Sequence, residues 1–181
     1  MKPNVFLEGK NIYLRGLEEA DAQGNYKYWF NDKDVCGGNS HHRFPMAEES
    51  LKRYINGANN SSDRIILAIV DKLTDSHIGN ISLQNINYIN RSAEFAIIIG
   101  EKDYWDKSIG RDAATLIIEH GFNSLNLNRI YCGTYSNNLG MQNMALALGF
   151  VKEGILREAD FKEGNYVDII KYGLLRKEYK K

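Results

Sequence analysis

The chain has 181 residues, of which 43% are hydrophobic and 25% are charged. This composition excludes an intrinsically disordered or fibrous protein, and the length suits a single folded domain over residues 1–181. The 23 Lys and Arg residues balance the 23 Asp and Glu residues, so no global basic field favours nucleic acid as a partner.

The N-terminal residues contain no long apolar stretch, and no segment approaches about 18 consecutive apolar residues. We therefore expect a cytoplasmic protein with no membrane partner. The two cysteines, Cys36 and Cys132, lie far apart and belong to no Cys-x-x-Cys or Cys/His cluster. This spacing predicts neither a disulfide framework nor a metal site.

The first quarter of the chain combines one short strand with helices. Residues 11–16 (NIYLRG) alternate apolar and polar side chains, as in a half-buried strand, and residues 18–32 have the pattern of a helix despite Gly24. Residues 35–45 (VCGGNSHHRFP) contain paired glycines and a proline, which predicts a mobile loop. An amphipathic helix is expected to follow over residues 46–58.

Three β-branched segments occupy the middle of the chain, at residues 64–71, 77–87 and 92–100. Short turn-rich stretches separate them, so they predict three consecutive antiparallel strands.

The second half alternates helices with strands. We predict a helix over residues 109–124, a strand over residues 128–135, and a short helix within residues 137–150 that ends at Gly149. Two strands joined across KEGN within residues 156–175 predict a terminal hairpin. The order of these elements indicates an α+β fold with a mixed, mostly antiparallel sheet flanked by helices rather than a doubly wound one.

The stretch YWDKSIGRDAATLIIEHGF places a glycine at the start of a predicted helix. Backbone N–H groups of a helix N-terminus can bind phosphate oxygens. Here those groups would come from five consecutive residues: Lys107, Ser108, Ile109, Gly110 and Arg111. A plain strand-to-helix loop is the alternative, because glycine before a helix is common.

Two longer segments resemble the core of the GCN5-related N-acetyltransferase (GNAT) superfamily. AEFAIIIGEKDYWDKSIGRDAATLIIEHGF is similar to its acetyl-CoA signature, and NRIYCGTYSNNLGMQNMALALGFVKEGILRE to its second half. NIYLRG and YGLL resemble the branch with ribosomal-protein N-terminal and small-amine acetyltransferases. The resemblance implies a splayed sheet and an acetyl-CoA-dependent transferase that acetylates a primary amine by direct attack in a ternary complex.

The acetyl-CoA loop departs from the family pattern Q/R-x-x-G-x-G/A. Trp105 stands at the first position and Ser108 at the first glycine, and only Gly110 matches. If Ser108 must adopt a positive φ, the conformation costs about 1 kcal/mol or more.

An attacking amine has a pKa near 10, so it needs a base or a desolvating pocket. The resemblance favours Glu94, a carboxylate within an apolar strand, as a base that acts through water. The alternatives are that Glu94 faces solvent or forms an ion pair with Arg91.

The resemblance also implies a binding strand and an asparagine for the cofactor. Backbone N–H groups around Ile97, Ile98 and Ile99 would polarise the thioester carbonyl. Asn138 would bind the pantetheine arm, cap the following helix, or do both.

The resemblance places the acceptor pocket near the 35–45 loop, where His41 and His42 are candidate base or substrate-binding residues. Tyr166 and Asp168 of the terminal hairpin could close this pocket. As acceptor we expect a small amine, such as a nucleotide-linked amino sugar, or a protein N-terminus. The neutral chain gives no particular support to polyamines, and a homodimer is possible.

The departing thiolate has no evident proton donor. Relatives carry Tyr or Ser on the short helix, where this chain has Met141 and Ala145. Tyr135, Ser136 or water could substitute, or the helix dipole could stabilise the thiolate. The alternative function is a catalytically weak acyl-CoA-binding or sensing module. A dinucleotide-binding oxidoreductase would need an early G-x-G-x-x-G motif, which the sequence lacks.

Overall fold

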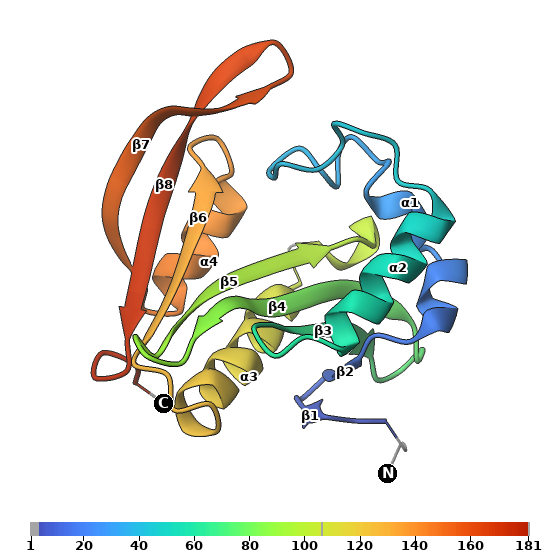
Figure 1. The fold of residues 1–181 in the computed structure, drawn as a ribbon, viewed down its shortest axis with the longest axis horizontal. Helices are drawn as coiled ribbons and strands as arrows, with labels where there is room; N and C mark the ends of the chain where they lie inside the picture. Colours follow the sequence, from blue (N-terminus) through green and yellow to red (C-terminus); the bar gives the residue numbers. More distant parts are fainter. Residues whose placement is uncertain (1–3, 106, 181) are drawn as a thin grey trace.

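The computed structural model describes residues 4–105 and 107–180. The strands among these residues form one eight-stranded sheet (Figure 1). The strand order is β1-β2-β3-β4-β5-β6-β8-β7, and every neighbouring pair is antiparallel except β5 and β6. The strands are β1 (Leu7–Glu8), β2 (Ile12–Gly16), β3 (Ile65–Asp71), β4 (His77–Asn87), β5 (Ser92–Ile99), β6 (Arg129–Tyr135), β7 (Val151–Lys162) and β8 (Asn165–Leu175). The mixed, mostly antiparallel α+β architecture expected from the sequence is confirmed.

Helices cover both faces of the sheet. They are the 3₁₀ helices η1 (Glu19–Gln23) and η2 (Lys102–Tyr104) and the α-helices α1 (Tyr26–Trp29), α2 (Glu48–Asn59), α3 (Ile109–Asn123) and α4 (Leu139–Ala147). One hydrophobic cluster joins the sheet to α3 and α4, and a second joins it to η1, α1 and α2. The sheet is therefore the middle of three layers.

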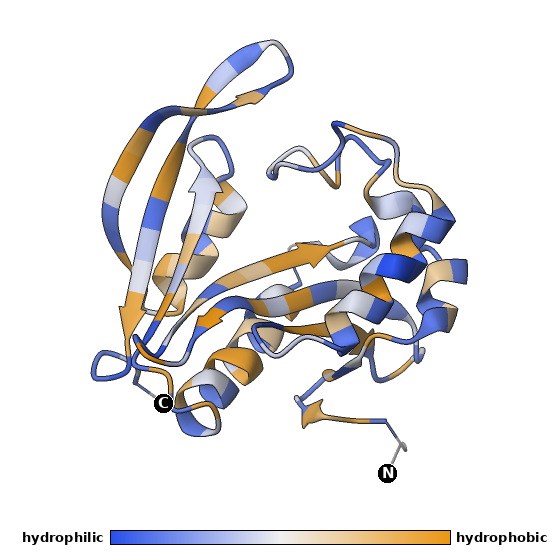
Figure 2. Ribbon diagram, viewed as in Figure 1, coloured by the Kyte–Doolittle hydropathy of each residue, from blue (hydrophilic) through white to orange (hydrophobic). Residues whose placement is uncertain are grey.

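Strand periodicity divides the side chains of β5 between these two clusters. Ala93 and Phe95 pack on the α3/α4 side, whereas Ile98 packs on the α1/α2 side. Successive strand residues point to opposite faces, so Glu94 shares the α1/α2 face with Ile98. Because apolar side chains of β5 lie on both faces, the strand is hydrophobic along most of its length (Figure 2).

The parallel contact between β5 and β6 is short. Ser92, Ala93 and Glu94 pair with Arg129, Ile130 and Tyr131, and no pairing continues beyond them among the described residues. From there the two strands diverge (Figure 1). β6 remains paired along its other edge with β8, so the sheet is continuous but splayed.

Several features of the chain differ from the expected elements, among them η2, which the sequence did not predict. The helix predicted over residues 18–32 is instead the separate η1 and α1, because Gly24 adopts an extended backbone between them (φ −80°, ψ −161°). β1 was not expected, since two residues carry no periodic signal. β7 begins at Val151, earlier than predicted, and is largely exposed, so its alternation in hydrophobicity is weak. The other strands and α2, α3 and α4 are where the sequence places them.

Buried polar groups attach η1 to β2. Asp21 is only 7% exposed and accepts two hydrogen bonds from the Arg15 guanidinium, at 2.8 and 2.7 Å. It also accepts one from the Glu18 backbone N–H at 2.8 Å and lies 3.4 Å from His77 Nδ1. Burial alone raises the pKa of the Asp21 carboxyl, but hydrogen bonds from Arg15 and His77 outweigh burial and leave that pKa well below its usual value.

No helix among the described residues is long and apolar enough to cross a bilayer. The same residues contain no group of three or more His, Cys, Asp or Glu side chains arranged for a metal ion. Cys36 and Cys132 are free and buried.

Asp21→Asn is expected to lower the free energy of unfolding at pH 7 by about 3 kcal/mol, because it leaves the half-buried Arg15 without its counter-ion. The folded-state pKa of Asp21 is lowered, so its contribution is present above about pH 4 and is lost as the pH falls further. Chemical denaturation between pH 3 and 7 should show a flatter pH dependence for the variant. Glu49→Gln, which breaks an exposed pair with Lys52, is the matched control; equal effects of both variants would contradict the prediction.

Candidate active site

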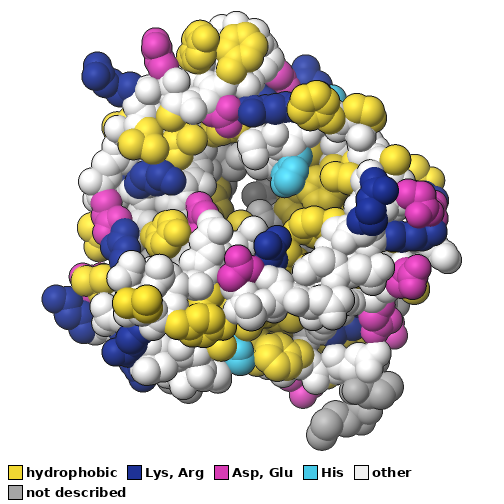
Figure 3. Space-filling model, in the orientation of Figure 1, with side chains coloured by type: hydrophobic (Ala, Val, Ile, Leu, Met, Phe, Trp, Pro, Cys, Tyr) yellow, Lys and Arg dark blue, Asp and Glu magenta, His cyan; other side chains and the backbone are white. Residues whose placement is uncertain are grey.

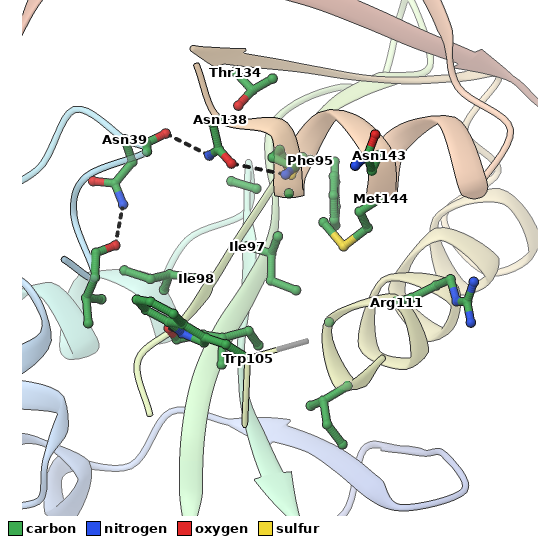
Figure 4. Close-up of a pocket in the computed structure, with 18 of the residues that line it drawn as sticks. Asn39, Phe95, Ile97, Ile98, Trp105, Arg111, Thr134, Asn138, Asn143 and Met144 are labelled. Atoms are coloured by element: carbon green, nitrogen blue, oxygen red, sulfur yellow. Dashed lines mark hydrogen bonds between the residues drawn. The ribbon is translucent and has the colours of Figure 1, made fainter. Parts of the chain in front are cut away.

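A cavity of about 760 Å³ lies where β5 and β6 separate. We call it the β5–β6 cavity. Its walls come from β5, residues 104–105 and 107–111, the end of β6, α4 and residues 34–39, and its view in Figure 4 shows side chains from each of these regions. Figure 3 shows the molecular surface hollowed on this face, with hydrophobic side chains along one wall.

The residues that the sequence suggested for cofactor binding all line this cavity, as does Glu94. They are Ile97, Ile98, Ile99, Lys107, Ser108, Ile109, Gly110, Arg111 and Asn138. They come from three separate parts of the chain, so only the fold brings them together.

The β5 wall offers backbone hydrogen-bond donors. The Arg91 carbonyl faces β6, because it accepts from the Asn128 and Arg129 backbone N–H groups at 2.6 and 3.2 Å. Backbone groups of successive strand residues point to alternate edges, so the N–H groups of Phe95 and Ile97 point into the space that β6 has left. The Ile99 carbonyl on the same edge accepts a bond from Trp105 Nε1 at 3.0 Å.

The N-terminus of α3 closes one end of the cavity. A Cβ on Gly110 would lie 3.5 Å from Met144 Sδ and 3.6 Å from Ile97 Cδ1, in ordinary van der Waals contact, so a side chain larger than alanine would enter the space between α3 and β5. The first N–H groups of a helix have no intrahelical acceptor, and they carry the positive end of its dipole. Lys107 and Arg111 add two cationic side chains to this end of the cavity.

Asn138 begins α4 and also contacts the 35–45 loop. Its Oδ1 accepts from the Met141 backbone N–H at 3.1 Å, and its Nδ2 donates to the Gly38 carbonyl at 3.1 Å. A Cβ on Gly38 would lie 2.3 Å from Asn138 Nδ2, so no side chain fits there. Because its side chain accepts from the Met141 N–H, Asn138 is the cap of α4, one of the roles expected from the sequence. Its contact with the pantetheine arm stays a prediction.

Glu94 contributes a half-buried carboxylate to the cavity. Its Oε2 accepts a hydrogen bond from Asn85 Nδ2 at 3.0 Å, and no ion pair of Glu94 occurs among residues 4–105 and 107–180. Arg91, the alternative partner, instead donates to the Asn126 backbone carbonyl and side chain at 2.7 and 2.8 Å. The negative charge of Glu94 is thus uncompensated by any cationic side chain of the described chain.

The 35–45 loop is fastened to the terminal hairpin. Arg43 forms a hydrogen-bonded ion pair with Asp160 and donates to the Phe161 carbonyl at 3.1 Å. Asp160 also accepts from the Tyr135 hydroxyl at 2.6 Å, and burial together with this bond raises the pKa of Tyr135 to about 12. The loop has no helix or strand, as expected, but these bonds fix its end.

Tyr135 and the four expected acceptor residues are absent from the cavity lining. The His41 ring packs on Phe30 with centroids 4.5 Å apart, and desolvation lowers the pKa of this histidine. His42 is exposed. Tyr166 packs against Phe161, and Asp168 accepts from the Glu158 backbone N–H at 2.8 Å within the hairpin. Their roles toward substrate stay predictions.

Sequence reasoning did not single out two residues that line the β5–β6 cavity, Gly38 and Thr134. Gly38 lines the cavity, and the adjacent glycines of the loop were the available signal. Thr134 follows Ile130 and Cys132 on one face of β6, and a hydroxyl on an otherwise apolar strand face was the signal there.

Residues 11–151 match the family model described as an acetyltransferase (GNAT) domain. The chain belongs to this family. It is 31% identical over 177 residues to a spermidine N(1)-acetyltransferase of Vibrio cholerae, with 93% of this chain and 95% of that protein covered. It is 29% identical over 175 residues to the uncharacterized N-acetyltransferase p20 of Bacillus licheniformis, with 96% and 97% covered.

The fold is also shared with solved GNAT structures. A crystal structure of spermidine N-acetyltransferase from Vibrio cholerae in complex with CoA and spermine matches with a TM-score of 0.85 at 27% identity, covering 93% of this chain and 98% of that one. The GNAT resemblance and the acyltransferase class expected from the sequence are therefore confirmed.

The GNAT loop of this chain contains a strained residue. Ser108, the N-cap of α3, has φ 60° and ψ 2°, and its side chain forms no capping hydrogen bond. This left-handed conformation is the one that glycine adopts without a steric penalty, which explains why glycine suits the position in the family pattern.

Ser108→Gly is expected to raise the free energy of unfolding by up to about 1 kcal/mol, because glycine relieves the strain of the positive φ. Thermal unfolding would measure the change. Ser108→Ala is the matched control, since alanine removes the hydroxyl but keeps the strain, and it should unfold like the parent. A glycine variant no more stable than the alanine variant would show that the strain is absent.

Proposed function

We propose that this chain transfers the acetyl group of acetyl-CoA to a small-molecule primary amine by direct attack in a ternary complex. The observation that carries the proposal is the polarity of the β5–β6 cavity. An uncompensated carboxylate, Glu94, lies near the root of the splay, and the α3 N-terminus with Lys107 and Arg111 lies at the other end. Glu94 and Ile99 are five residue steps apart along the strand, or about 16 Å.

The positive end of the cavity suits the diphosphate of acetyl-CoA. Backbone N–H groups at a helix N-terminus bind phosphate oxygens, and the two cationic side chains add attraction. The pantetheine arm would then lie between β5 and β6, with the thioester carbonyl accepting a bond from the Ile97 N–H. The match to a GNAT crystal structure in complex with CoA supports this placement.

The negative end suits the acceptor amine. Glu94 points to the α1/α2 face of the sheet, opposite to the face on which α3 and α4 pack. An ammonium group attracted by this carboxylate must lose a proton before its nitrogen can attack. Glu94 accepts that proton, directly or through water, and the neutral nitrogen then attacks the thioester carbon.

Similarity to spermidine acetyltransferases makes polyamines the first acceptors to test. The net charge of the whole chain gave no support to polyamine acceptors. The local charge of the cavity supports them, because the carboxylate residues Asp34 and Glu94 both line it. Asp34 is bound to Lys102 at 2.6 Å, so Glu94 carries the uncompensated charge. A nucleotide-linked amino sugar and a peptide N-terminus complete the panel of candidate acceptors.

A catalytically weak acyl-CoA-binding or sensing module is the second candidate. It is favoured by α4, where Met141 lines the cavity and Ala145 is 1% exposed in the core, and neither can donate a proton. Release of CoA in the presence of amine separates the two functions, because a sensing module would bind acetyl-CoA without turnover. A single domain over residues 1–181, a cytoplasmic location and a homodimer stay predictions.

Acetyl-CoA at about 100-fold its Kd should stabilise the protein by about 2.7 kcal/mol, which raises Tm by about 5 to 10 °C. Gly110→Val should abolish most of this shift, because the added methyl groups would occupy the space between α3 and β5. Gly57→Val is the matched control, since the Gly57 site on α2 is open and outside the cavity. An unchanged acetyl-CoA shift in Gly110→Val would place the cofactor elsewhere.

Glu94→Gln should lower kcat by about 100-fold or more at pH 7, the usual contribution of a general base. The acetyl-CoA shift in Tm should be unchanged, because Glu94 lies away from the α3 end. Glu49→Gln on the outer face of α2 is the control for a lost surface carboxylate. Parent-like turnover by the glutamine variant would exclude Glu94 from the mechanism.

A further inference from the structure

Thr134 has a buried hydroxyl with no hydrogen-bond partner. The residue is 5% exposed, and its Oγ1 contacts no donor or acceptor within the described part of the chain. It shares a face of β6 with Ile130 and Cys132, both in the hydrophobic core. A buried polar group without a partner destabilises a fold, so this hydroxyl calls for a physical explanation.

Thr134 lies beside the β5–β6 cavity, and its hydroxyl oxygen is itself closed off from solvent. β6 leaves β5 after Tyr131, and Thr134 lies beyond that point, four residues before the α4 cap Asn138. It is one of the residues that line the β5–β6 cavity. Figure 4 shows it on the wall formed by β6 and α4, above Asn138 and Phe95 and across from Ile97.

The reaction needs a polar group on this wall. Attack by the amine forms a C–N bond and breaks the C–S bond, whose electron pair remains on sulfur. The amine loses a proton in the process, and the CoA thiolate is finally protonated from water. α4 presents Met141, Met144 and Asn143 to the cavity. The methionines cannot donate a hydrogen bond to the developing negative charge, so the Asn143 amide is the one side-chain donor among these three.

The other hydroxyls in the described cavity lining are placed elsewhere. Tyr104 donates to Asp71 at 3.3 Å, and Ser108 lies at the start of α3. Tyr135, which is next to Thr134 in the chain but does not line the cavity, turns to the opposite face and donates to Asp160. Among these hydroxyls, only that of Thr134 lies on the β6/α4 wall without a partner.

We propose that the Thr134 side chain turns toward the cavity when acetyl-CoA binds, and that its hydroxyl then donates a hydrogen bond to the sulfur and stabilises the thiolate as the C–S bond breaks. The proposal rests on the acetyl transfer proposed above and adds a catalytic residue to it. The missing partner in the protein is then the sulfur of the co-substrate. The cost of burying the hydroxyl is offset only when acetyl-CoA is bound.

The test compares Thr134→Val, which has nearly the same shape without the hydroxyl, with Thr134→Ser, which keeps it. With polyamine and acetyl-CoA as substrates, the valine variant should lose at least 10-fold in kcat, while the serine variant stays within about threefold of the parent. The Kd for acetyl-CoA should change less than twofold in both. Tm of the valine variant should be equal to or higher than that of the parent, because an unpaired buried hydroxyl is removed.

An unchanged kcat in Thr134→Val would overturn the proposal, as would a loss confined to acetyl-CoA affinity, which would indicate a contact with the pantetheine arm. A drop in Tm that accompanies the drop in kcat would mean that the hydroxyl is structural. If the valine variant does not fold, Thr134→Ala replaces it in the comparison with serine. Absence of an acetyl-CoA shift in the parent would instead overturn the proposed function itself.

Discussion

The short pairing of β5 with β6 is the constraint on which the rest of the site depends. Three residue pairs join the two strands before they separate. Beyond that point β5 remains paired with β4, and β6 remains paired with β8. The sheet therefore stays continuous while one edge of β5 is released from pairing. A cavity can form inside the fold only because the backbone groups of that edge are left for a ligand.

Charge is distributed along this cavity rather than across the molecule. Formal charges cancel over the whole chain, yet the α3 end combines a helix N-terminus with Lys107 and Arg111, and the β5 root carries Glu94. An anionic donor and a cationic acceptor would thus be oriented by opposite ends of one cavity. Net charge could not reveal this separation, since it averages over groups that never face the same ligand.

The loop before α2 links the two halves of the structure. Gly38 bonds to the cap of α4 through Asn138, and Arg43 bonds to Asp160 at the hairpin β7–β8. Both contacts join residues about one hundred positions apart in the chain. They hold the loop beside the cavity even though it has no regular secondary structure, so its position depends on side-chain bonds instead of backbone ladders.

The sequence alone determined the elements and the family. Hydrophobic periodicity located β3, β4, β5, α3 and β6 because those segments are long and bury one or both faces, and the motifs around Gly110 and Asn138 indicated acetyl transfer. It failed where local pattern is weak, at the two residues of β1 and at the break between η1 and α1.

Only the tertiary structure decided which side chains meet. It separated Glu94 from Arg91, directed the Tyr135 hydroxyl to Asp160, and left the Thr134 hydroxyl buried and unpaired beside the cavity. A one-dimensional pattern specifies which face of a strand a residue occupies, but hydrogen-bond partners are set by how strands and loops distant in sequence pack together. The direction in which β6 leaves β5 is such a property, and the chemistry of the site follows from it.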